Sequence, residues 1–443
     1  MVFSMQNVFE FIENLISGIF PFALLMLVGI YFTFKTKGYQ FRNLSKSVKV
    51  FFCGGADKNN GITPFQSACN SLSATVGTGN IVGVAAAVAL GGAGAVFWMW
   101  VSALVAMCVK SAEIVISCEF KEKKAGESFG GPMYYIKNGL PSRYGFLAKI
   151  YAFSGIFACF CTGNIIQTNS AVICFSNDGN TRLLMGIVFS VITAVVVIGG
   201  VKKISKFTTK AVPFMSVLYT VLCLGVIFVN IRLVPECFLK IFIGAFNPSA
   251  VTGGAVGSVL ATVIGGASKG IFSNEAGLGT AAMAYAISSD NDTKKQGLYG
   301  IFEVFLDTIV LCTLTALTIL CSGVIIDYGN AAALPIIDAF SVLYGPFSQN
   351  LLALMLCLFG ISSIIGWAVY GINCSSYLFG NKGKKIFVYT YPFFCVLGAV
   401  LNVKTVWRVA EFFNGIMLTI NLFSLLILAD KIIPILKGNK NDI

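Results

Sequence analysis

Glycine, hydroxyl and amide residues crowd one short part of an otherwise apolar segment. The stretch from Ser73 to Gly83 reads SATVGTGNIVG and includes Thr75, Thr78 and Asn80. Glycine weakens a helix interior by about 1 kcal/mol relative to alanine, and a membrane span cannot leave backbone groups unpaired. The stretch is therefore either a close packing face between helices, as its G-x-x-x-G spacing allows, or a helix break that binds a ligand.

A second segment has the same character. Residues 265–281 read GGASKGIFSNEAGLGTA, where glycines flank Ser273, Asn274 and Glu275. A broken helix offers free N–H groups to a carboxylate at one half-helix start and free carbonyl groups to a sodium ion at the other half-helix end. Two glycine-broken spans at corresponding positions indicate a secondary transporter site, so we predict a helix break in both segments.

The composition is that of a polytopic membrane protein. Of the 443 residues, 56% are hydrophobic and 11% are charged, whereas a soluble domain carries about 25% charged residues. There are 0 histidines, which excludes histidine proton relays and histidine metal sites. No G-x-x-x-x-G-K-[ST] phosphate loop is present. We therefore expect neither an enzyme nor a bound cofactor.

The elements that must position these residues are membrane spans of about 20 apolar residues each. Eleven candidates lie at about 12–34, 64–90, 94–119, 146–175, 182–200, 208–230, 255–287, 297–322, 349–379, 386–402 and 406–433. With the N-terminus outside, 24 of the 31 lysines and arginines fall on the inner side and 5 on the outer side. This bias predicts an outside N-terminus and a cytoplasmic C-terminus, and it explains the net charge of +12 without a nucleic acid. We expect a multi-pass protein of the plasma membrane, the prokaryotic inner membrane.

The two glycine-rich segments are the second and seventh spans, which are five helices apart. Because five is odd, two five-helix halves insert in opposite orientations. We therefore expect one transmembrane domain over 1–443, with an extra helix at 12–34 and inverted repeats at 62–230 and 255–433.

Several long motifs resemble the alanine or glycine:cation symporter family, the sodium:alanine symporters. They are SATVGTGNIVGVAAAVALGGAGAVFWMW, GGPMYYI (130–136), GNIIQTNS (163–170), GIFSNEAGLGTA (270–281) and SSIIGWAVYG (362–371). The resemblance runs from about Ile62 to Phe379 and continues more weakly to the end. It implies an all-α polytopic protein of the LeuT-type fold, with a five-plus-five inverted repeat and one added helix. It also implies sodium-coupled symport of a small neutral amino acid, alanine and/or glycine, into the cell by alternating access.

Site residues follow from the breaks and from the resemblance. The LeuT-type fold implies a sodium site made by the carbonyls of Ser73 and Val76 with the hydroxyls of Ser362 and Ser363. Trp367 would wall the side-chain pocket, since overfilling a packed site costs about 1–3 kcal/mol. The expected substrate contacts are Thr75, Gly77, Thr78, Gly79, Asn80, Gln167, Asn169, Gly270, Phe272, Ser273, Asn274 and Trp367.

Other interpretations stay open from the sequence. Serines in membrane helices often bond their own backbone. Proton coupling through Glu275 or Asp307 is the alternative to sodium, whereas a channel would need repeated rings of carbonyls or charges. Glu275 could instead offset Lys269 or cap the broken helix, and the role of Glu303 is also open. So are the choice among alanine, glycine and serine, L or D selectivity, sodium stoichiometry and the oligomeric state.

The sequence also predicts one local ion pair. Lys110 and Glu113 stand at i, i+3 within the third expected span, a spacing at which helix side chains meet.

Overall fold

The computed structural model describes residues 19–53, 61–124, 127–175, 178–253, 258–328, 335–401 and 403–438. Residues 12–18 of the expected extra helix and 255–257 of the expected seventh span lie outside this described part. Helices dominate it, and one short antiparallel hairpin joins β1 (Glu122–Lys124) to β2 (Glu127–Phe129). The expectation of an all-α architecture therefore holds apart from this hairpin.

The helices before the second broken segment follow the order of the expected spans. They are α2 (Ile19–Lys35), α3 (Tyr39–Cys53), α4 (Pro64–Thr75), η1 (Thr78–Asn80), α5 (Val82–Gly91), α6 (Gly94–Glu119), α7 (Pro132–Gly139), η2 (Ser142–Tyr144), α8 (Gly145–Phe160), η3 (Cys161–Ile165), α9 (Ile166–Phe175), α10 (Gly179–Val197), α11 (Gly200–Val229), η4 (Ile231–Leu233), α12 (Val234–Phe246) and α13 (Pro248–Thr252).

The remaining helices begin with the second broken segment. They are α14 (Val259–Asn274), α15 (Thr280–Ala286), α16 (Thr293–Val304), η5 (Phe305–Cys312), α17 (Thr313–Cys321), α18 (Pro335–Tyr344), η6 (Gly345–Phe347), α19 (Ser348–Thr390), α20 (Phe393–Val400), α21 (Val403–Ile427) and α22 (Ala429–Lys437). Two of these segments, η3 and η5, are π-helical.

Seven helices in the described part are long and apolar enough to cross a membrane, or up to nine if each bent pair forms one span. The bent pairs are α2 with α3, at 86°, and α4 with α5, at 56°. Helix α19 runs through two expected spans and changes direction at Gly380, whose φ is 62°. The chain is thus a multi-pass membrane protein, while the count of eleven spans and the inverted repeat stay predictions.

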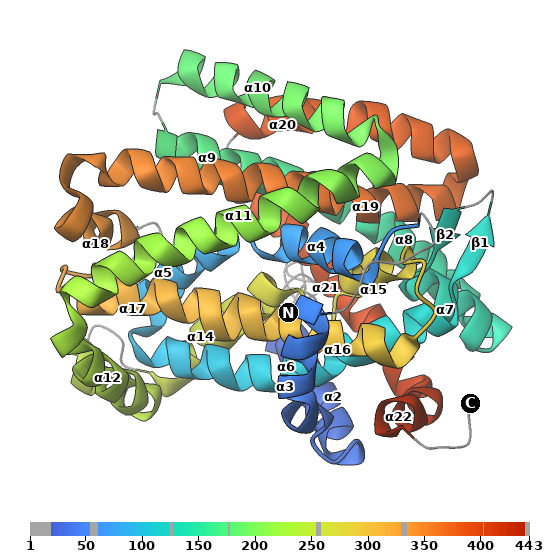
Figure 1. Ribbon diagram of the computed structural model, residues 1–443, viewed down its shortest axis with the longest axis horizontal. Helices are drawn as coiled ribbons and strands as arrows, with labels where there is room; N and C mark the ends of the chain where they lie inside the picture. Colours follow the sequence, from blue (N-terminus) through green and yellow to red (C-terminus); the bar gives the residue numbers. More distant parts are fainter. Residues whose placement is uncertain are drawn as a thin grey trace, which may run out of the picture.

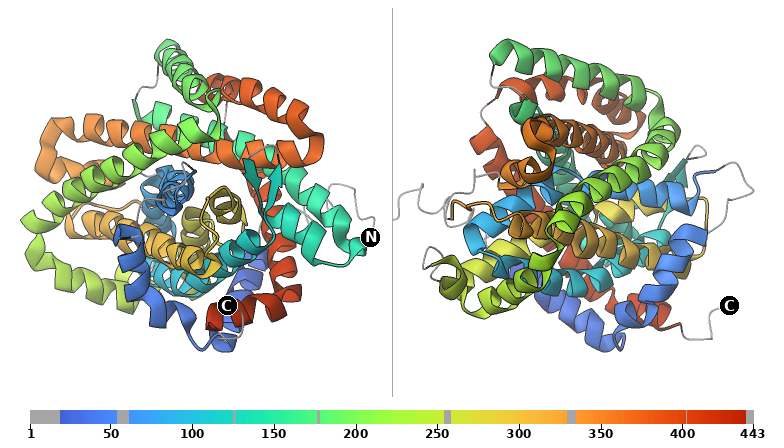
Figure 2. Two further views of the ribbon diagram at one scale, coloured as in Figure 1. Left: turned by 45° about the vertical axis from the view of Figure 1, so that its right-hand side comes forward. Right: turned by 60° about the vertical axis from the view of Figure 1, so that its left-hand side comes forward.

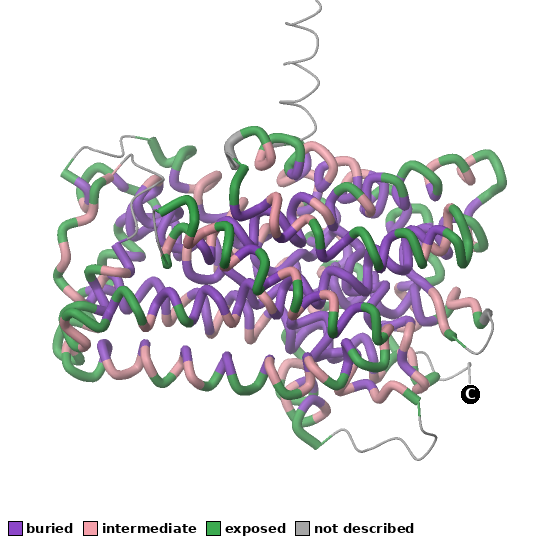
Figure 3. The backbone as a smooth tube through the Cα atoms, turned by 90° about the horizontal axis from the view of Figure 1, so that it is seen from above, coloured by how far each residue is buried: buried purple, intermediate pink, exposed green. Residues whose placement is uncertain are grey.

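The two glycine-rich segments lie inside the bundle. Figure 2 shows the blue α4 and α5 and the yellow α14 and α15 in the interior, enclosed by the longer helices. Helices α12 and α18 lie at one end of the bundle, and α7, α22 and the hairpin lie at the other (Figure 1). Buried residues fill the centre (Figure 3), whereas the outer helices expose apolar side chains such as Leu184, Phe214 and Phe228. Such an outer surface suits lipid.

The start of α4 shows how local sequence fixes the first broken helix. Thr63 is the N-cap: its hydroxyl accepts from Gln66 N, and Gln66 Oε1 accepts from Thr63 N. Pro64 occupies the first helical position, where its missing N–H costs nothing. This reciprocal cap defines where the helix that leads to the break begins.

Candidate functional site

The first predicted break is confirmed. Helix α4 ends at Thr75, the chain is extended at Gly77 (φ −138°, ψ −160°), and it resumes as η1 and α5 at an angle of 56°. Gly77 N–H donates to Asn80 Oδ1 at 2.9 Å, and Asn80 N–H donates to the Gly77 carbonyl at 3.2 Å. The break is therefore a defined turn held by Asn80.

This turn leaves helix carbonyls without their usual donors. Continued helix would direct Gly77 N–H to the Ser73 carbonyl and Asn80 N–H to the Val76 carbonyl. Both N–H groups bond elsewhere, as described above. The two carbonyls that the sequence assigns to sodium therefore lie at a helix end that carries partial negative charge.

Helix α19 passes beside this helix end, and Ser363 of the adjacent pair Ser362 and Ser363 lies next to Gly77. A β-carbon added at Gly77 would lie 2.5 Å from Ser363 Oγ, and one added at Gly366 would overlap Ser73 Oγ. Ser362 and Ser363 are fully buried, and neither hydroxyl has a hydrogen-bond partner among the described residues. The bond to their own helix backbone that the sequence left open is therefore not made. Buried polar groups usually have partners, so two adjacent hydroxyls without partners among the described residues call for an explanation by a bound ligand.

The second predicted break is also confirmed. Helix α14 ends at Asn274, and α15 begins at Thr280. Between them Gly277 and Gly279 have φ angles of 87° and 78°, which favour glycine. Glu275 adopts φ 54°, an unusual conformation for a side chain larger than glycine.

Side chains satisfy the carbonyls of the second break. Lys110 Nζ donates to the Asn274 carbonyl at 2.7 Å, Asn421 Nδ2 to that of Gly277 at 2.8 Å, and Tyr151 OH to that of Leu278 at 2.6 Å. The two breaks therefore differ chemically. Donors of the protein bond these three carbonyls of the second break, whereas among the described residues the Ser73 and Val76 carbonyls of the first lack their helical donors and the Ser362 and Ser363 hydroxyls have no partner.

Lys110 also forms a buried ion pair, but not the expected one. Its Nζ lies 3.2 Å from Glu303 Oε2, and both side chains are almost completely buried. Glu303 further accepts from Ser71 Oγ and Tyr285 OH. The prediction of a Lys110–Glu113 pair is wrong, because Glu113 Oε1 accepts from the amide of Asn421 instead.

Asp307 links the two breaks. Its Oδ1 accepts from Asn80 Nδ2 of the first break at 2.7 Å, and its Oδ2 accepts from Ser273 Oγ of the second at 2.9 Å. Thr308 Oγ1 adds a third bond at 2.9 Å. Asp307 lies on the π-helical η5, and such bulges are frequent at functional sites. Asn80 and Ser273 are thus brought together as expected, both through this carboxylate and directly, since Asn80 Nδ2 donates to Ser273 Oγ at 3.0 Å.

Gln167 joins the fourth expected span to the first break. Its Oε1 accepts from Thr78 Oγ1 at 2.9 Å and from Thr78 N–H at 3.4 Å. Asn169, two residues later, points elsewhere: its amide donates to the Gly398 and Leu401 carbonyls beside α20. Of these two proposed contacts, Gln167 is placed at the break and Asn169 is not.

Of the other expected contacts, some lie between the two breaks and others bond or pack elsewhere. A β-carbon at Gly79 would lie 3.9 Å from Phe272 Cδ1, which places these residues of the two breaks together. Thr75 Oγ1 bonds carbonyls of its own helix, and Gly270 packs against α6. Asn274 is occupied within its own break, where it accepts from Ala276 N–H and donates to Thr308.

Trp367 belongs to α19, and its side chain packs against the π-helical η3. The side chain is 1% exposed, and a β-carbon at Gly163 would lie 2.5 Å from it. Its indole N–H has no acceptor among the described residues. The side chain therefore packs against the fourth expected span, four residues before Gln167.

A cavity of about 150 Å³ borders the C-terminal end of α14, next to the second break. Phe272 and Lys269 line it together with Glu411 and Asn414 of α21. Lys269 lies over the ring of Trp407, 5.7 Å from its centroid, and Glu275 Oε2 accepts from Thr280 Oγ1. Glu275 thus caps the broken helix locally, which was one of its expected roles.

Sequence reasoning did not assign four of the residues that shape this site. They are Tyr151, Tyr285 and Asn421, which hold backbone or carboxylate groups, and Asp307, whose role was left open. Charge inside a span was a usable signal for Asp307, because ionisable groups within membranes are costly and usually functional. The tyrosines and Asn421 carry no such signal, because their partners are backbone groups or distant side chains.

Comparisons with known proteins show which proteins this chain resembles. The model of the sodium:alanine symporter family matches residues 2–442. The sodium/alanine symporter AgcS of Methanococcus maripaludis is 37% identical over 435 residues, covering 95% of this chain and 94% of AgcS. The probable sodium/glutamine symporter GlnT of Bacillus subtilis is 36% identical over 442 residues, covering 98% of this chain and 91% of GlnT.

Among solved structures, MhsT in complex with L-phenylalanine has a TM-score of 0.59 to this chain at 13% identity. The match covers 84% of this chain and 97% of MhsT. MhsT is a LeuT-fold transporter. At this identity the likeness shows a shared fold alone.

Proposed function

The chain belongs to the sodium:alanine symporter family, whose members are transporters rather than enzymes, and from this premise we propose that it is a sodium-coupled symporter of a small neutral amino acid. Cation-coupled amino-acid transport is what the family and the relatives have in common. Sodium as the ion, alanine and/or glycine as the substrate, and uptake by alternating access are the finer parts of the proposal.

The observation that carries the sodium assignment is the unpartnered hydroxyl pair. Ser362 and Ser363 are buried and adjacent, and Ser363 lies beside the end of α4, where carbonyls lack their helical donors. Hydroxyl and carbonyl oxygens suit a hard monovalent cation, and they do not need to lose a proton to bind it. Such a site supports sodium over a proton as the coupling ion.

The surroundings of Asp307 support the same choice. Its carboxylate accepts from an amide and two hydroxyl groups and links both breaks. These bonds suit a fixed bridge between the two broken helices. A proton carrier would have to give up this arrangement at each cycle.

The substrate fits between the two breaks. Gly79 N–H has no acceptor in the part of the chain that the structure describes, so it can meet a carboxylate at the start of a half-helix. The amide of Gln167 stands beside Thr78 and can meet an ammonium or a carboxylate group. No charged side chain is needed for a zwitterion in this arrangement.

Similarity to the relatives does not decide how large the transported amino acid is. The relative named for alanine and the one named for glutamine are 37% and 36% identical to this chain. Trp367 supports a small substrate, because a bulky buried ring packed on the span that carries Gln167 leaves little room for a longer side chain.

The proposed transport cycle uses the inverted repeats 62–230 and 255–433, which present one break each. The orientation we propose, with the N-terminus outside and the C-terminus in the cytoplasm, is supported by the separation of α12 and α18 from α7 and α22 at opposite ends of the bundle (Figure 1). That separation matches the lysine and arginine bias of the connecting segments.

Counterflow of labelled alanine in proteoliposomes tests the proposal. Sodium, lithium or an imposed pH gradient is supplied in turn. We expect exchange that requires sodium and that unlabelled alanine or glycine outcompetes. Uptake that follows the pH gradient without sodium would instead establish the proton-coupled alternative.

A further inference from the structure

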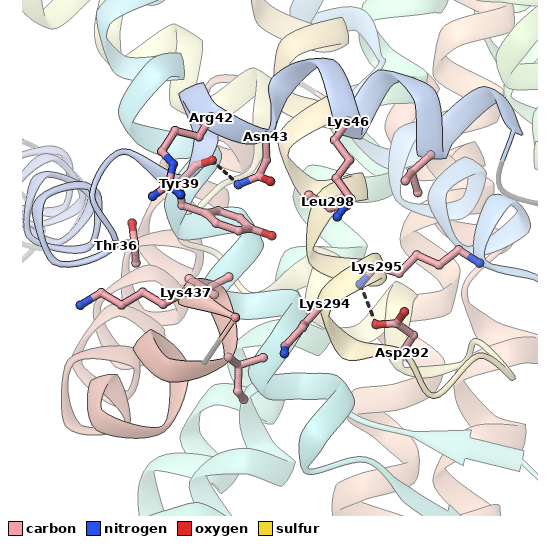
Figure 4. Close-up of a pocket in the computed structure, with 14 residues that line it drawn as sticks. Thr36, Tyr39, Arg42, Asn43, Lys46, Asp292, Lys294, Lys295, Leu298 and Lys437 are labelled. Atoms are coloured by element: carbon pink, nitrogen blue, oxygen red, sulfur yellow. Dashed lines mark hydrogen bonds between the residues drawn. The ribbon is translucent and has the colours of Figure 1, made fainter. Parts of the chain in front are cut away.

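A basic cavity lies well away from both breaks. It has a volume of about 490 Å³ and is enclosed by α3, the start of α16 and the end of α22 (Figure 4). Ligand sites of small molecules typically have volumes of about 300–1,000 Å³. Its five cationic side chains are Arg42, Lys46, Lys294, Lys295 and Lys437.

Most of this positive charge is not compensated. Lys295 Nζ pairs with Asp290, which lies at 3.1 Å. The one carboxylate of the lining, that of Asp292, caps α16 by accepting from Lys295 N–H at 3.0 Å. Within the described part of the chain, the four other cations form no salt bridge. A pocket with this balance attracts an anion.

Helix α3 shows the imbalance in its own sequence. Arg42 and Lys46 stand at i, i+4, where like charges repel. The helix, YQFRNLSKSVKVFFC, contains no acidic residue that could offset them. An anion bound between the helices would remove this repulsion.

The pocket is held in shape before any ligand binds. The ring of Phe51 on α3 lies 4.1 Å from that of Phe302 on α16. At the other end of α3, a β-carbon at Gly297 of α16 would lie 3.9 Å from Tyr39 OH. The hydroxyl of Tyr39 and the ammonium group of Lys46 point toward the middle of the pocket (Figure 4). A prepared site of this kind binds with a smaller entropic cost.

Its position favours a ligand at the membrane surface. Helix α3 turns 86° from α2 and exposes Phe41 and Phe52, at 55% and 72%. An amphipathic helix with aromatic and basic residues lies in the interface of a bilayer. The pocket also has an apolar wall that includes Val50, Leu298 and Ile435, which suits acyl-chain atoms beside a charged headgroup.

We propose that this pocket binds a phosphate-bearing ligand, supplied by the headgroup of an anionic phospholipid of the inner leaflet. The phosphate joins α3, α16 and α22. Helix α16 carries Glu303 and continues into η5 with Asp307, so the bound lipid stabilises the frame that holds both breaks. This inference rests on the proposed orientation for the leaflet, and it does not depend on which ion or amino acid is transported.

The test compares thermal unfolding of the purified full chain in phosphatidylcholine nanodiscs with and without phosphatidylglycerol. The pocket variant is Lys46→Gln with Lys294→Gln. The matched control, Lys202→Gln with Lys203→Gln, removes two exposed charges from the start of α11, outside this pocket. A further arm adds inorganic phosphate to the phosphatidylcholine nanodiscs.

We expect phosphatidylglycerol to raise the unfolding temperature of the wild type and of the control. A separate titration with phosphatidylglycerol from mixed micelles measures its affinity. The lipid should bind the pocket variant about thirtyfold more weakly than the wild type, because each basic residue at an anionic surface contributes about 1 kcal/mol. Potassium chloride should weaken the effect through screening. Equal stabilisation of the pocket variant and the control would overturn the site, and full stabilisation by inorganic phosphate alone would overturn the lipid as its source. If the double variant does not fold, Arg42→Gln on the exposed side of α3 gives the same comparison.

Discussion

Lys110 Nζ lies 2.7 Å from the carbonyl oxygen of Asn274, so an ammonium group of the protein closes the end of helix α14. The end of α4 has no such group, and two hydroxyls without partners among the described residues face it. The two segments are thus both broken helices, but they differ in the backbone of the break and in its chemistry. In the proposed function, this difference lets one break hold the coupling ion while the other stays fixed.

Loss of Lys110 should destabilise the protein severely. Lys110→Met leaves Glu303 buried without its counter-charge, which typically costs about 3–5 kcal/mol. Adding Glu303→Gln should restore much of the loss, because a neutral pair needs no compensation. Thermal unfolding in detergent measures both. Lys240→Met, which breaks the exposed pair with Glu236, should cost less than about 1 kcal/mol. A Lys110 variant as stable as the Lys240 variant would contradict this account of the second break.

Gln167 is expected to contribute directly to substrate affinity. Gln167→Ala removes the acceptor of Thr78 and a direct bond to a charged group of alanine, and it should weaken alanine binding by about tenfold to 150-fold, the effect of one hydrogen bond to a charged group. Equilibrium binding of labelled alanine to the purified protein measures this. Asn169→Ala is the matched control, since that amide bonds carbonyls beside α20. It should lower stability and leave affinity unchanged, and the opposite pattern would assign the contact to Asn169.

Trp367 should set the upper limit on substrate size. Trp367→Ala opens space beside Gly163 and should increase glutamine uptake relative to alanine uptake. Competition by unlabelled glutamine against labelled alanine in proteoliposomes gives the ratio. Trp98→Ala, at the periphery where the indole bonds the Ala245 carbonyl, controls for the loss of a large ring. If the Trp367 variant transports with the selectivity of the wild type, the wall of the pocket lies elsewhere.

Asp307 should act as a bridge rather than as a proton carrier. Asp307→Asn can keep an oxygen toward Asn80 and an amide toward the hydroxyls, so sodium-driven uptake should persist. Asp307→Ala leaves buried donors unpaired, each at about 1–3 kcal/mol, and should unfold at a lower temperature. Uptake that vanishes in Asp307→Asn while alanine and sodium still bind would show that Asp307 carries a proton.

The sequence was sufficient for the features that depend on local chemistry. Both breaks were predictable because left-handed backbone and close approach need glycine, as Gly277, Gly279 and Gly77 show. The hydroxyl pair of α19 was reachable through the family resemblance. The unusual φ of Glu275 was not, because its N–H bond to Ile271 and its bond from Thr280 appear only in the folded chain.

Long-range partners were the part that the sequence did not reveal. Lys110 has a carboxylate at i+3, yet it pairs with Glu303, which lies 193 residues later in the chain. A local spacing gives a weak preference that tertiary packing readily overrides. The GNIIQTNS motif likewise placed Gln167 and Asn169 together, although two residues along a helix face different neighbours.

The sodium dependence of alanine uptake in proteoliposomes tests the central claim most directly. Ser362→Ala with Ser363→Ala removes both hydroxyls and nearly keeps the volume. The account predicts that the sodium concentration for half-maximal uptake rises about tenfold or more, a change of about 1.4 kcal/mol or more, while the unfolding temperature without sodium stays close to that of the wild type. An unchanged sodium dependence in the double variant, or wild-type uptake that follows a pH gradient without sodium, would contradict it.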